Sequence, residues 1–315
     1  MRREPRRRRL LRRLAGLAAC GFAGGLAAPP AFAAGPAPGR AEPVPTVAAA
    51  SGLKFAIEEL AAAFTRETGR KLRLSFGSSG NFARQIEQGA PFELFLSADE
   101  AMVFRLADKG LTLDRGTLYA VGRLVLIVPR GSPLKPDGEL RDLAAALVDG
   151  RLKRFAIANP EHAPYGKRAE EALRHAGLWE AIRPRLVMGE NVAQAAQFAT
   201  SGSAQGGIVA HSLALAPALA GGSHFALIPA AWHQPLNQRM VLLKGAGETA
   251  RAFHDWLLQP AARAVMARYG YGPPEEGKGE GGEEGKGEGG RGKVQGGGKA
   301  GSGKTGEGAA WTGSR

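Results

Sequence analysis

Serines and glycines that follow two predicted strands are the residues of this chain whose types and spacing best suit ligand chemistry. Ser51-Gly52 lies between a predicted strand and a helix, and Gly77-Ser78-Ser79-Gly80 lies between the next strand and the next helix. In a parallel α/β sheet, both segments fall at the carboxyl ends of strands, where ligands bind. Each helix start offers unpaired backbone N–H groups and a partial positive charge of about +0.5. The arrangement suits a small anion, although such serines are also ordinary helix caps worth roughly 1 kcal/mol each.

Side chains typical of catalysis or metal binding show no comparable order. The six histidines lack metal-ligand spacing, and no Gly-x-Ser-x-Gly segment follows a strand. Ser51, His162 and Asp99 form a triad only on paper, so a Ser-dependent hydrolase is the alternative from a different class. The P-loop pattern at Gly298–Thr305 follows Gly-rich sequence where its mechanism needs a buried strand. We therefore expect a protein that is not an enzyme and holds neither a nucleotide nor a resident cofactor.

The elements that position the two serine segments alternate between strands and helices. Apolar residues at 47–50, 72–76 and 94–96 predict strands, and the helices between them end at Gly69 and Gly89. A second series predicts strands at 124–128, 155–158, 186–188, 207–210, 225–228 and 241–243, and helices near 167–175, 191–200, 248–258 and 260–269. This alternation predicts mainly parallel sheets with helices on both faces, in two α/β units with a cleft between them.

The net charge of +13 does not indicate a nucleic-acid partner. Residues 1–33 hold eight arginines and one glutamate, and residues 275–315 hold seven basic and seven acidic residues. The core between them has only a modest positive excess, without the aromatic interleaving of single-strand binders. We therefore exclude nucleic acid as a partner.

The N-terminus is typical of an export signal. An Arg-rich run at 2–13 precedes an apolar stretch at 14–28, and Ala31-Phe32-Ala33 is an A-x-A cleavage site. The apolar stretch is shorter than the ~20 residues that a spanning helix needs. We predict a periplasmic protein cleaved after Ala33, and the export route, general or twin-arginine, stays open. Lipid anchoring through Cys20 is the less favoured alternative, because few apolar residues would precede the cut.

These patterns divide the chain into five predicted parts. A signal peptide occupies 1–33 and a linker 34–43. The first lobe takes 44–122 plus about 227–274, and the second takes about 123–226. The tail at 275–315 repeats EEGKGEGG at 275–282 and 283–290 and has little to bury, so we expect it to be disordered.

Several segments in the core resemble the periplasmic molybdate-binding proteins. The resemblance spans about residues 45–272, with its motifs in the expected order. It rests on Ala49-Ala50-Ser51, Ser75–Gly80, Ala83–Pro91, Phe95–Glu100, Ala158–Gly166 and the closing Pro260–Tyr271.

The resemblance implies an α/β type II periplasmic-binding fold, with two lobes, a hinge and a ligand cleft. It implies that the chain binds molybdate or tungstate and delivers it to the permease and ATPase subunits of an ABC importer. Molybdenum would be present only within the oxyanion, and we expect a monomer. A receptor for sulfate or another small oxyanion is the alternative within binding proteins.

The resemblance also assigns oxyanion contacts to positions of this chain. Ser51, Ser79 and Tyr165 match contacting residues, and Val192 matches one that acts through its backbone N–H. Gly52 replaces a side-chain-bearing residue and can offer only its N–H. Many relatives have a tyrosine where this chain has Ala210, and the hydroxyl of Tyr165 is a candidate for that donor.

The chemistry of the oxyanion agrees with this set of residues. A divalent oxyanion without protons needs donors and no carboxylates, and none of the assigned residues is acidic. Phosphate retains protons and would require an acceptor in the site. Sulfate differs from molybdate mainly in size, which the sequence does not fix.

Overall fold

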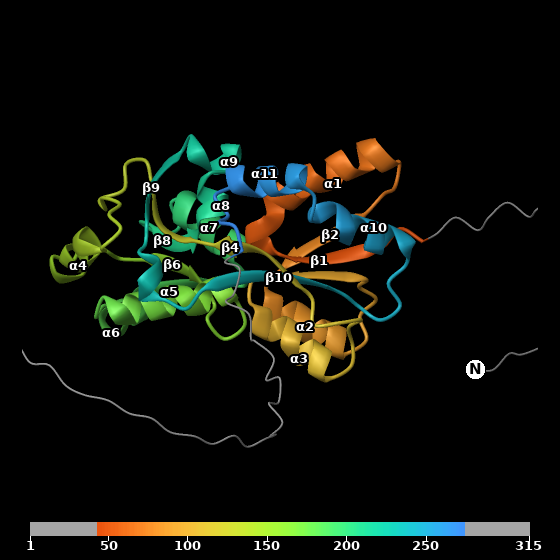
Figure 1. Cartoon of the computed structure of the whole chain (residues 1–315). Helices are drawn as coiled ribbons and strands as arrows, with labels where there is room; N and C mark the ends of the chain where they lie inside the picture. The colour runs from red at the N-terminus through yellow and green to blue at the C-terminus, as the bar shows by residue number, and fades with distance from the viewer. Residues whose placement is uncertain (1–42, 275–315) are drawn as a thin grey trace, which may run out of the picture. The chain divides into compact units, whose positions relative to one another are not determined.

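The computed structural model describes residues 43–274 (Figure 1). The predicted signal peptide, Cys20, the linker up to residue 42, the tail and the P-loop-like segment lie outside the described residues. Within residues 43–274, no helix is long and apolar enough to cross a membrane.

Five strands form the first sheet, in the order β2-β1-β3-β10-β4. β1 pairs in parallel with β2 and β3, whereas β10 runs antiparallel to β3 and β4. We call this sheet and its helices the first lobe. Its strands are β1 (Thr46–Ala50), β2 (Arg73–Gly77), β3 (Leu94–Ser97), β4 (Thr117–Gly122) and β10 (Leu236–Leu242).

The second sheet repeats this arrangement, in the order β7-β6-β8-β5-β9. β6 pairs in parallel with β7 and β8, and β5 is antiparallel to β8 and β9. We call it and its helices the second lobe. Its strands are β5 (Leu124–Pro129), β6 (Phe155–Ala158), β7 (Leu186–Gly189), β8 (Gly207–Ala210) and β9 (Ser223–Leu227).

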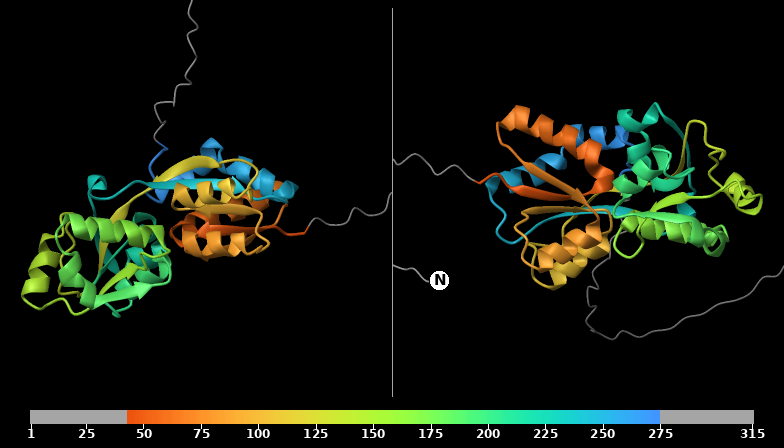
Figure 2. Two further views of the ribbon diagram at one scale, coloured as in Figure 1. Left: turned by 90° about the horizontal axis from the view of Figure 1, so that it is seen from below. Right: turned by 180° about the vertical axis from the view of Figure 1, so that it is seen from behind.

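The prediction of mainly parallel sheets is wrong, because each sheet is mixed. The antiparallel ladders all involve β10 or β5, the two strands that enter a sheet directly from the other one. β4 ends at Gly122 and β5 begins at Leu124, and β9 leads to β10 over residues 228–235 (Figure 2). These crossings form a hinge between two α/β lobes, so the predicted fold class is confirmed. The predicted residue boundaries of the lobes stay a prediction.

Helices cover both faces of the first sheet, and the alternation of side chains along its strands shows why. Val47 and Ala49 pack in one hydrophobic cluster, which also contains Leu60 and Phe64 of helix α1 (Lys54–Thr68). Ala48 points the other way, into a cluster with residues of α2 (Ser79–Glu87) and α3 (Glu100–Asp108). Period-two alternation in a strand buried on both faces produces this division.

The helix α1 ends as its sequence predicts. Its buried side chains recur at helical spacing, and Gly69 follows in the left-handed conformation with φ 72°. At the end of its buried face, the Phe64 and Phe253 rings lie 5.1 Å apart between centroids. Burying such a side chain contributes about 1.5–3 kcal/mol, so this contact fixes α1 against the C-terminal helices.

The remaining helices complete the two lobes. Figure 1 shows α5 and α6 on the opposite side of the second sheet from α7 and α8. They are α4 (Arg141–Val148), α5 (Pro164–His175), α6 (Trp179–Ile182), α7 (Val192–Thr200), α8 (His211–Ala214), α9 (Pro217–Ala220), α10 (Glu248–Leu257) and α11 (Pro260–Arg268), with short 3₁₀ turns η1 (Ser51–Leu53), η2 (Arg183–Arg185) and η3 (Ala230–Trp232).

Candidate functional site

A small cavity lies where the first turns of η1, α2, α5 and α7 meet, so both lobes line it. Its volume is about 10 Å³, which corresponds to one water molecule. None of the lining residues carries a charged side chain. They are Ala50, Ser51, Gly77, Ser78, Ser79, Ala98, Ala163, Pro164, Tyr165 and Val192.

Ser51 stands at the start of η1, directly after β1, and only 2% of it is exposed. Its Oγ accepts a hydrogen bond from the backbone N–H of Ala193 at 3.2 Å, across to the second lobe. The hydroxyl hydrogen remains available to an anion, because that contact uses only a lone pair. No side chain caps η1, so its first-turn N–H groups are also available.

Ser79 is the first residue of α2 and is fully buried. Its Oγ accepts from the backbone N–H of Ala98 at 3.0 Å, so this hydroxyl can also donate to a ligand. Within the same turn, the N–H of Asn81 bonds to Ser78 Oγ and that of Gly80 bonds to the carbonyl of His162. Among the first N–H groups of α2, this leaves that of Ser79 for the cavity.

The two helices of the second lobe, α5 and α7, also begin at the cavity with a backbone N–H that no side chain caps. Asn191 caps α7 by accepting from the N–H groups of Ala193 and Gln194, both at 3.1 Å, and the cap does not engage the N–H of Val192. α5 begins with Pro164 and has no side-chain cap, so the N–H of Tyr165 is not capped either. Val192 and Tyr165 both line the cavity.

The side chain of Tyr165 extends from the cavity to the hinge. A Cβ built on Gly52 would lie 3.1 Å from its ring, and one built on Gly122 would lie 2.4 Å from its hydroxyl oxygen. The hydroxyl is therefore next to the end of β4 and close to Tyr271. This geometry favours the backbone N–H of Tyr165 over its hydroxyl as the donor.

Gly52 does not line the cavity, although the resemblance assigned it there. Its carbonyl accepts hydrogen bonds from Ser212 Oγ at 2.7 Å and from the Tyr271 hydroxyl at 2.9 Å. These two bonds fix the position of the η1 turn. A Cβ at this position would also lie 3.5 Å from that of Ala210. A side chain at position 52 would therefore press on the ring of Tyr165 and lie against Ala210.

Three buried tyrosines form a polar cluster between the cavity and the hinge. Burial, and then proximity to Tyr271, raise the pKa of Tyr119 and that of Tyr165 well above the usual value. Burial raises the pKa of Tyr271 to about 12. These hydroxyls stay protonated at neutral pH, so the cluster brings no negative charge close to the cavity.

Because of the buried tyrosines, we expect the unfolding free energy to fall at alkaline pH. Because the pKa of Tyr271 is about 12 in the folded state and about 10 in the unfolded state, its contribution is complete below pH 10 and is lost as pH rises towards 12. That single group accounts for roughly 3 kcal/mol of unfolding free energy. Urea unfolding measured from pH 8 to 12 should show this fall, and Tyr271→Phe should make it shallower. An identical pH profile in the variant would contradict the assignment.

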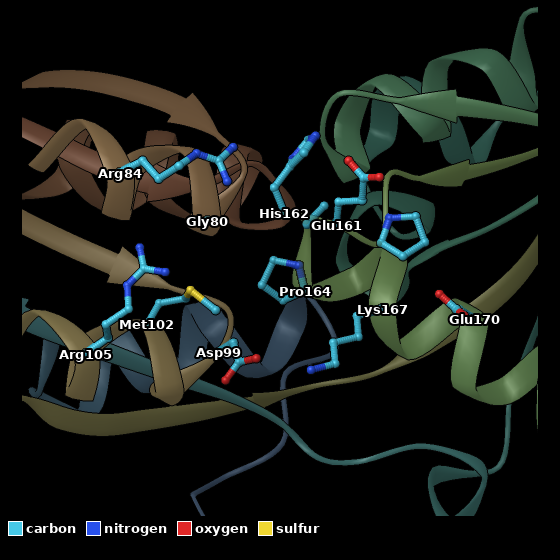
Figure 3. Close-up of a pocket in the computed structure, with 12 residues that line it drawn as sticks. Gly80, Arg84, Asp99, Met102, Arg105, Glu161, His162, Pro164, Lys167 and Glu170 are labelled. Atoms are coloured by element: carbon cyan, nitrogen blue, oxygen red, sulfur yellow. The ribbon is translucent and has the colours of Figure 1, made fainter. Parts of the chain in front are cut away.

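A wider pocket of about 340 Å³ opens next to the cavity. Figure 3 shows residues of α2 and α3 on one side of it and residues of the β6–α5 loop and α5 on the other. Its charged side chains are mixed in sign, with Arg84, Arg105 and Lys167 facing the same space as Asp99, Glu161 and Glu170. This pocket is the outer mouth of the cleft between the lobes.

The hypothetical triad of Ser51, His162 and Asp99 is not assembled. His162 Nδ1 lies 3.0 Å from Ser78 Oγ, and Asp99 accepts from the N–H of Ala101 and faces Arg168. Within residues 43–274, no group of three or more His, Cys, Asp or Glu side chains is arranged to hold a metal ion.

The cavity therefore combines two serine hydroxyls and first-turn N–H groups with no acidic side chain. Such a set can replace the water shell of an anion that has no proton to donate. The sequence predicted Ser51, Ser79, Tyr165 and Val192, and all four line the cavity. Six further lining residues were not assigned from the sequence: Ala50, Gly77, Ser78, Ala98, Ala163 and Pro164.

Comparison with known proteins identifies the family. The model of the bacterial extracellular solute-binding proteins matches residues 45–272. The molybdate-binding protein ModA of Azotobacter vinelandii is 40% identical over 72% of this chain and 88% of its own length, and ModA of Rhodobacter capsulatus is 38% identical over 68% and 82%.

A solved structure agrees with these sequence matches. The periplasmic molybdate-binding protein of A. vinelandii superposes with a TM-score of 0.67 and 31% identity, and covers 73% of this chain and all of its own. The chain therefore belongs to the bacterial extracellular solute-binding proteins, in the family of the molybdate-binding ModA proteins.

Proposed function

We propose that this protein binds molybdate or tungstate in the periplasm and delivers it to the permease and ATPase subunits of an ABC importer. The observation that carries the proposal is the lining of the cavity: serine hydroxyls and N–H groups from four helix or turn starts, with no carboxylate. The two relatives are named molybdate-binding proteins, which supports the same ligand for this chain.

Binding in this proposal closes the two lobes around the anion. Ser51 and Ser79 belong to the first lobe, and Tyr165 and Val192 belong to the second. An anion that accepts hydrogen bonds from all four favours the closed arrangement, because only there are both sets of donors within reach. The lobes open first, since a cavity of about 10 Å³ admits only a water molecule.

A thermal-shift titration of the full chain with molybdate, tungstate, sulfate and phosphate tests the ligand. At 100 times its dissociation constant, a ligand stabilises the folded state by about 2.7 kcal/mol. We expect shifts of this size with molybdate and tungstate at low concentration, a smaller one with sulfate and none with phosphate. Equal shifts with all four anions would refute the selectivity, and no shift with any would refute the function.

The protein is proposed to be a binding protein and not an enzyme. The hydroxyls of Ser51 and Ser79 contact backbone N–H groups of Ala193 and Ala98, and neither contacts a histidine that could activate it. Ser78 Oγ does lie 3.0 Å from His162 Nδ1, but it also accepts the N–H of Asn81 as the cap of α2. Turnover of a generic ester that Ser51→Ala abolishes would support the hydrolase instead. We also propose export with cleavage after Ala33, a monomeric state and no resident cofactor, which mass spectrometry of the periplasmic protein would test.

A further inference from the structure

One of the contacts between the two lobes beside the cavity is made by backbone atoms alone. The N–H of Gly80, in the first turn of α2, donates to the carbonyl of His162 at 3.0 Å. His162 lies in the loop between β6 and α5, so this bond joins the first lobe to the second. Figure 3 shows both residues at the mouth of the cleft.

The side chain of His162 makes a second contact across the same boundary. Its Nδ1 lies 3.0 Å from Ser78 Oγ, and only 9% of the side chain is exposed. Its Nε2 lies 3.6 Å from Glu190 Oε2, and the other oxygen of Glu190 accepts from Asn81 Nδ2. His162 is therefore held between side chains of both lobes.

The packing at Gly80 sets how closely the lobes approach. A Cβ built on Gly80 would lie 2.5 Å from the carbonyl oxygen of His162, 3.1 Å from its Cα and 3.2 Å from its carbonyl carbon. These three nearest atoms are backbone atoms of the other lobe, so no side-chain rotation relieves the overlap. Separation of the lobes relieves it completely.

We propose that Ser78, Gly80 and His162 form a closing latch that determines how tightly the oxyanion is held. The latch residues act as positioning residues: they bring the donors of the second lobe to within hydrogen-bond reach of an anion held by the first. This inference rests on the proposed function. Hydrogen bonds weaken steeply beyond about 3.2 Å, so a small increase in the separation of the lobes removes several of them together.

Gly80→Ala is the direct test, because it affects binding and folding in opposite directions. In the ligand-free chain, alanine is the better helix former, so the unfolding midpoint of the open form should stay unchanged or rise slightly. In the closed form, the methyl group would overlap the His162 carbonyl. We expect calorimetry with molybdate to show affinity weakened roughly tenfold or more.

Gly221→Ala is the matched control, since a Cβ at Gly221 meets nothing within 4 Å and its φ of −72° suits alanine. Its affinity for molybdate should equal that of the wild type. Wild-type affinity in Gly80→Ala would overturn the latch.

The side chain of His162 gives a second, milder test. His162→Ala removes the contact with Ser78 but keeps the backbone bond to Gly80, so dissociation of molybdate should accelerate several-fold. His162→Asn places an amide nitrogen near the position of Nδ1 and should restore slow dissociation. A role in folding alone would lower the unfolding midpoint of ligand-free His162→Ala without changing its dissociation rate, and that result would also overturn the latch.

A ligand-independent measurement separates failure of the latch from failure of the proposed function. Spin labels on Lys71→Cys and Lys153→Cys, both exposed and one in each lobe, report the separation of the lobes in a Cys20→Ser background. Without ligand, Gly80→Ala should lose the shortest distances that the wild type samples. Identical distributions would refute the latch even if wild-type protein binds none of the four anions, whereas lost short distances would support it in that case too.

Discussion

Ser51→Ala should weaken molybdate binding roughly 10- to 150-fold and leave the unfolding free energy of the ligand-free protein nearly unchanged. A hydrogen bond to a charged group contributes about 1.5–3 kcal/mol, which sets the size of the loss. The ligand-free protein is spared because the N–H that Ser51 accepts from, that of Ala193, also bonds to Asn191 Oδ1 at 3.1 Å. Calorimetric titration and urea unfolding measure the two quantities.

Ser79→Ala is the matched comparison for this prediction. Affinity should fall by a similar factor, but here the ligand-free protein should also lose about 1–3 kcal/mol, because the buried N–H of Ala98 loses its acceptor. Unchanged affinity in either variant would remove that serine from the site. Equal stability of the two variants would show that the Ser79 contact with Ala98 is not important for folding.

Gly166→Ala should cause the largest loss of stability, about 3 kcal/mol. Gly166 is buried in the first turn of α5, and a Cβ there would lie 2.1 Å from the carbonyl oxygen of Ala158 in β6. Both partners are backbone of the same lobe, so opening of the lobes cannot relieve the overlap and α5 must shift. For a protein of this size, the loss corresponds to a fall of about 6–12 °C in the unfolding midpoint.

The shift of α5 also moves Tyr165, so molybdate affinity should fall together with stability. This distinguishes Gly166→Ala from Gly80→Ala, which is expected to weaken binding without loss of stability. Gly221→Ala again serves as the control, with less than about 0.5 kcal/mol of change at this exposed position. A midpoint for Gly166→Ala within 2 °C of that control would contradict the structure around α5.

Residues whose roles depend on their neighbours in the chain were predictable from the sequence. Ser51 and Ser79 begin helical segments directly after strands, and this local pattern placed both in the lining. Gly69 was predictable for the same reason, since a helix that ends in the left-handed conformation favours glycine.

Features that depend on the other lobe could not be read from the sequence. The carbonyl of Gly52 accepts hydrogen bonds from Ser212 and Tyr271, which lie far along the chain. The predicted role of the Gly52 N–H stays a prediction. The hydroxyl of Tyr165 lies beside Gly122, at the end of β4, and this contact also joins segments that are distant in the sequence. The mixed sheets escaped prediction because alternation of strands and helices does not reveal strands that cross between sheets.

Several elements were not predicted, among them the short helices α6, α8 and α9, and three others were missed for a more local reason. β4 (Thr117–Gly122) has half-buried residues among its buried ones, so its apolar pattern is weak. α3 begins after Asp99, whose side chain caps it, and a strand-to-helix turn of this kind was noted only for the serines. α4 follows Leu140, which has a φ of 58°, and no sequence rule predicts that conformation for leucine.

The absence of charged side chains from the lining of the cavity has a consequence for unloading. Peptide dipoles and serine hydroxyls do not titrate in mild acid, so we expect that protonation of the lining residues plays no part in release of the anion. A competing anion in solution should also fail to displace the bound one while the lobes are closed, because the closed cavity excludes solvent. Release of the anion then requires separation of the two lobes, which lets water compete for the hydrogen-bond donors.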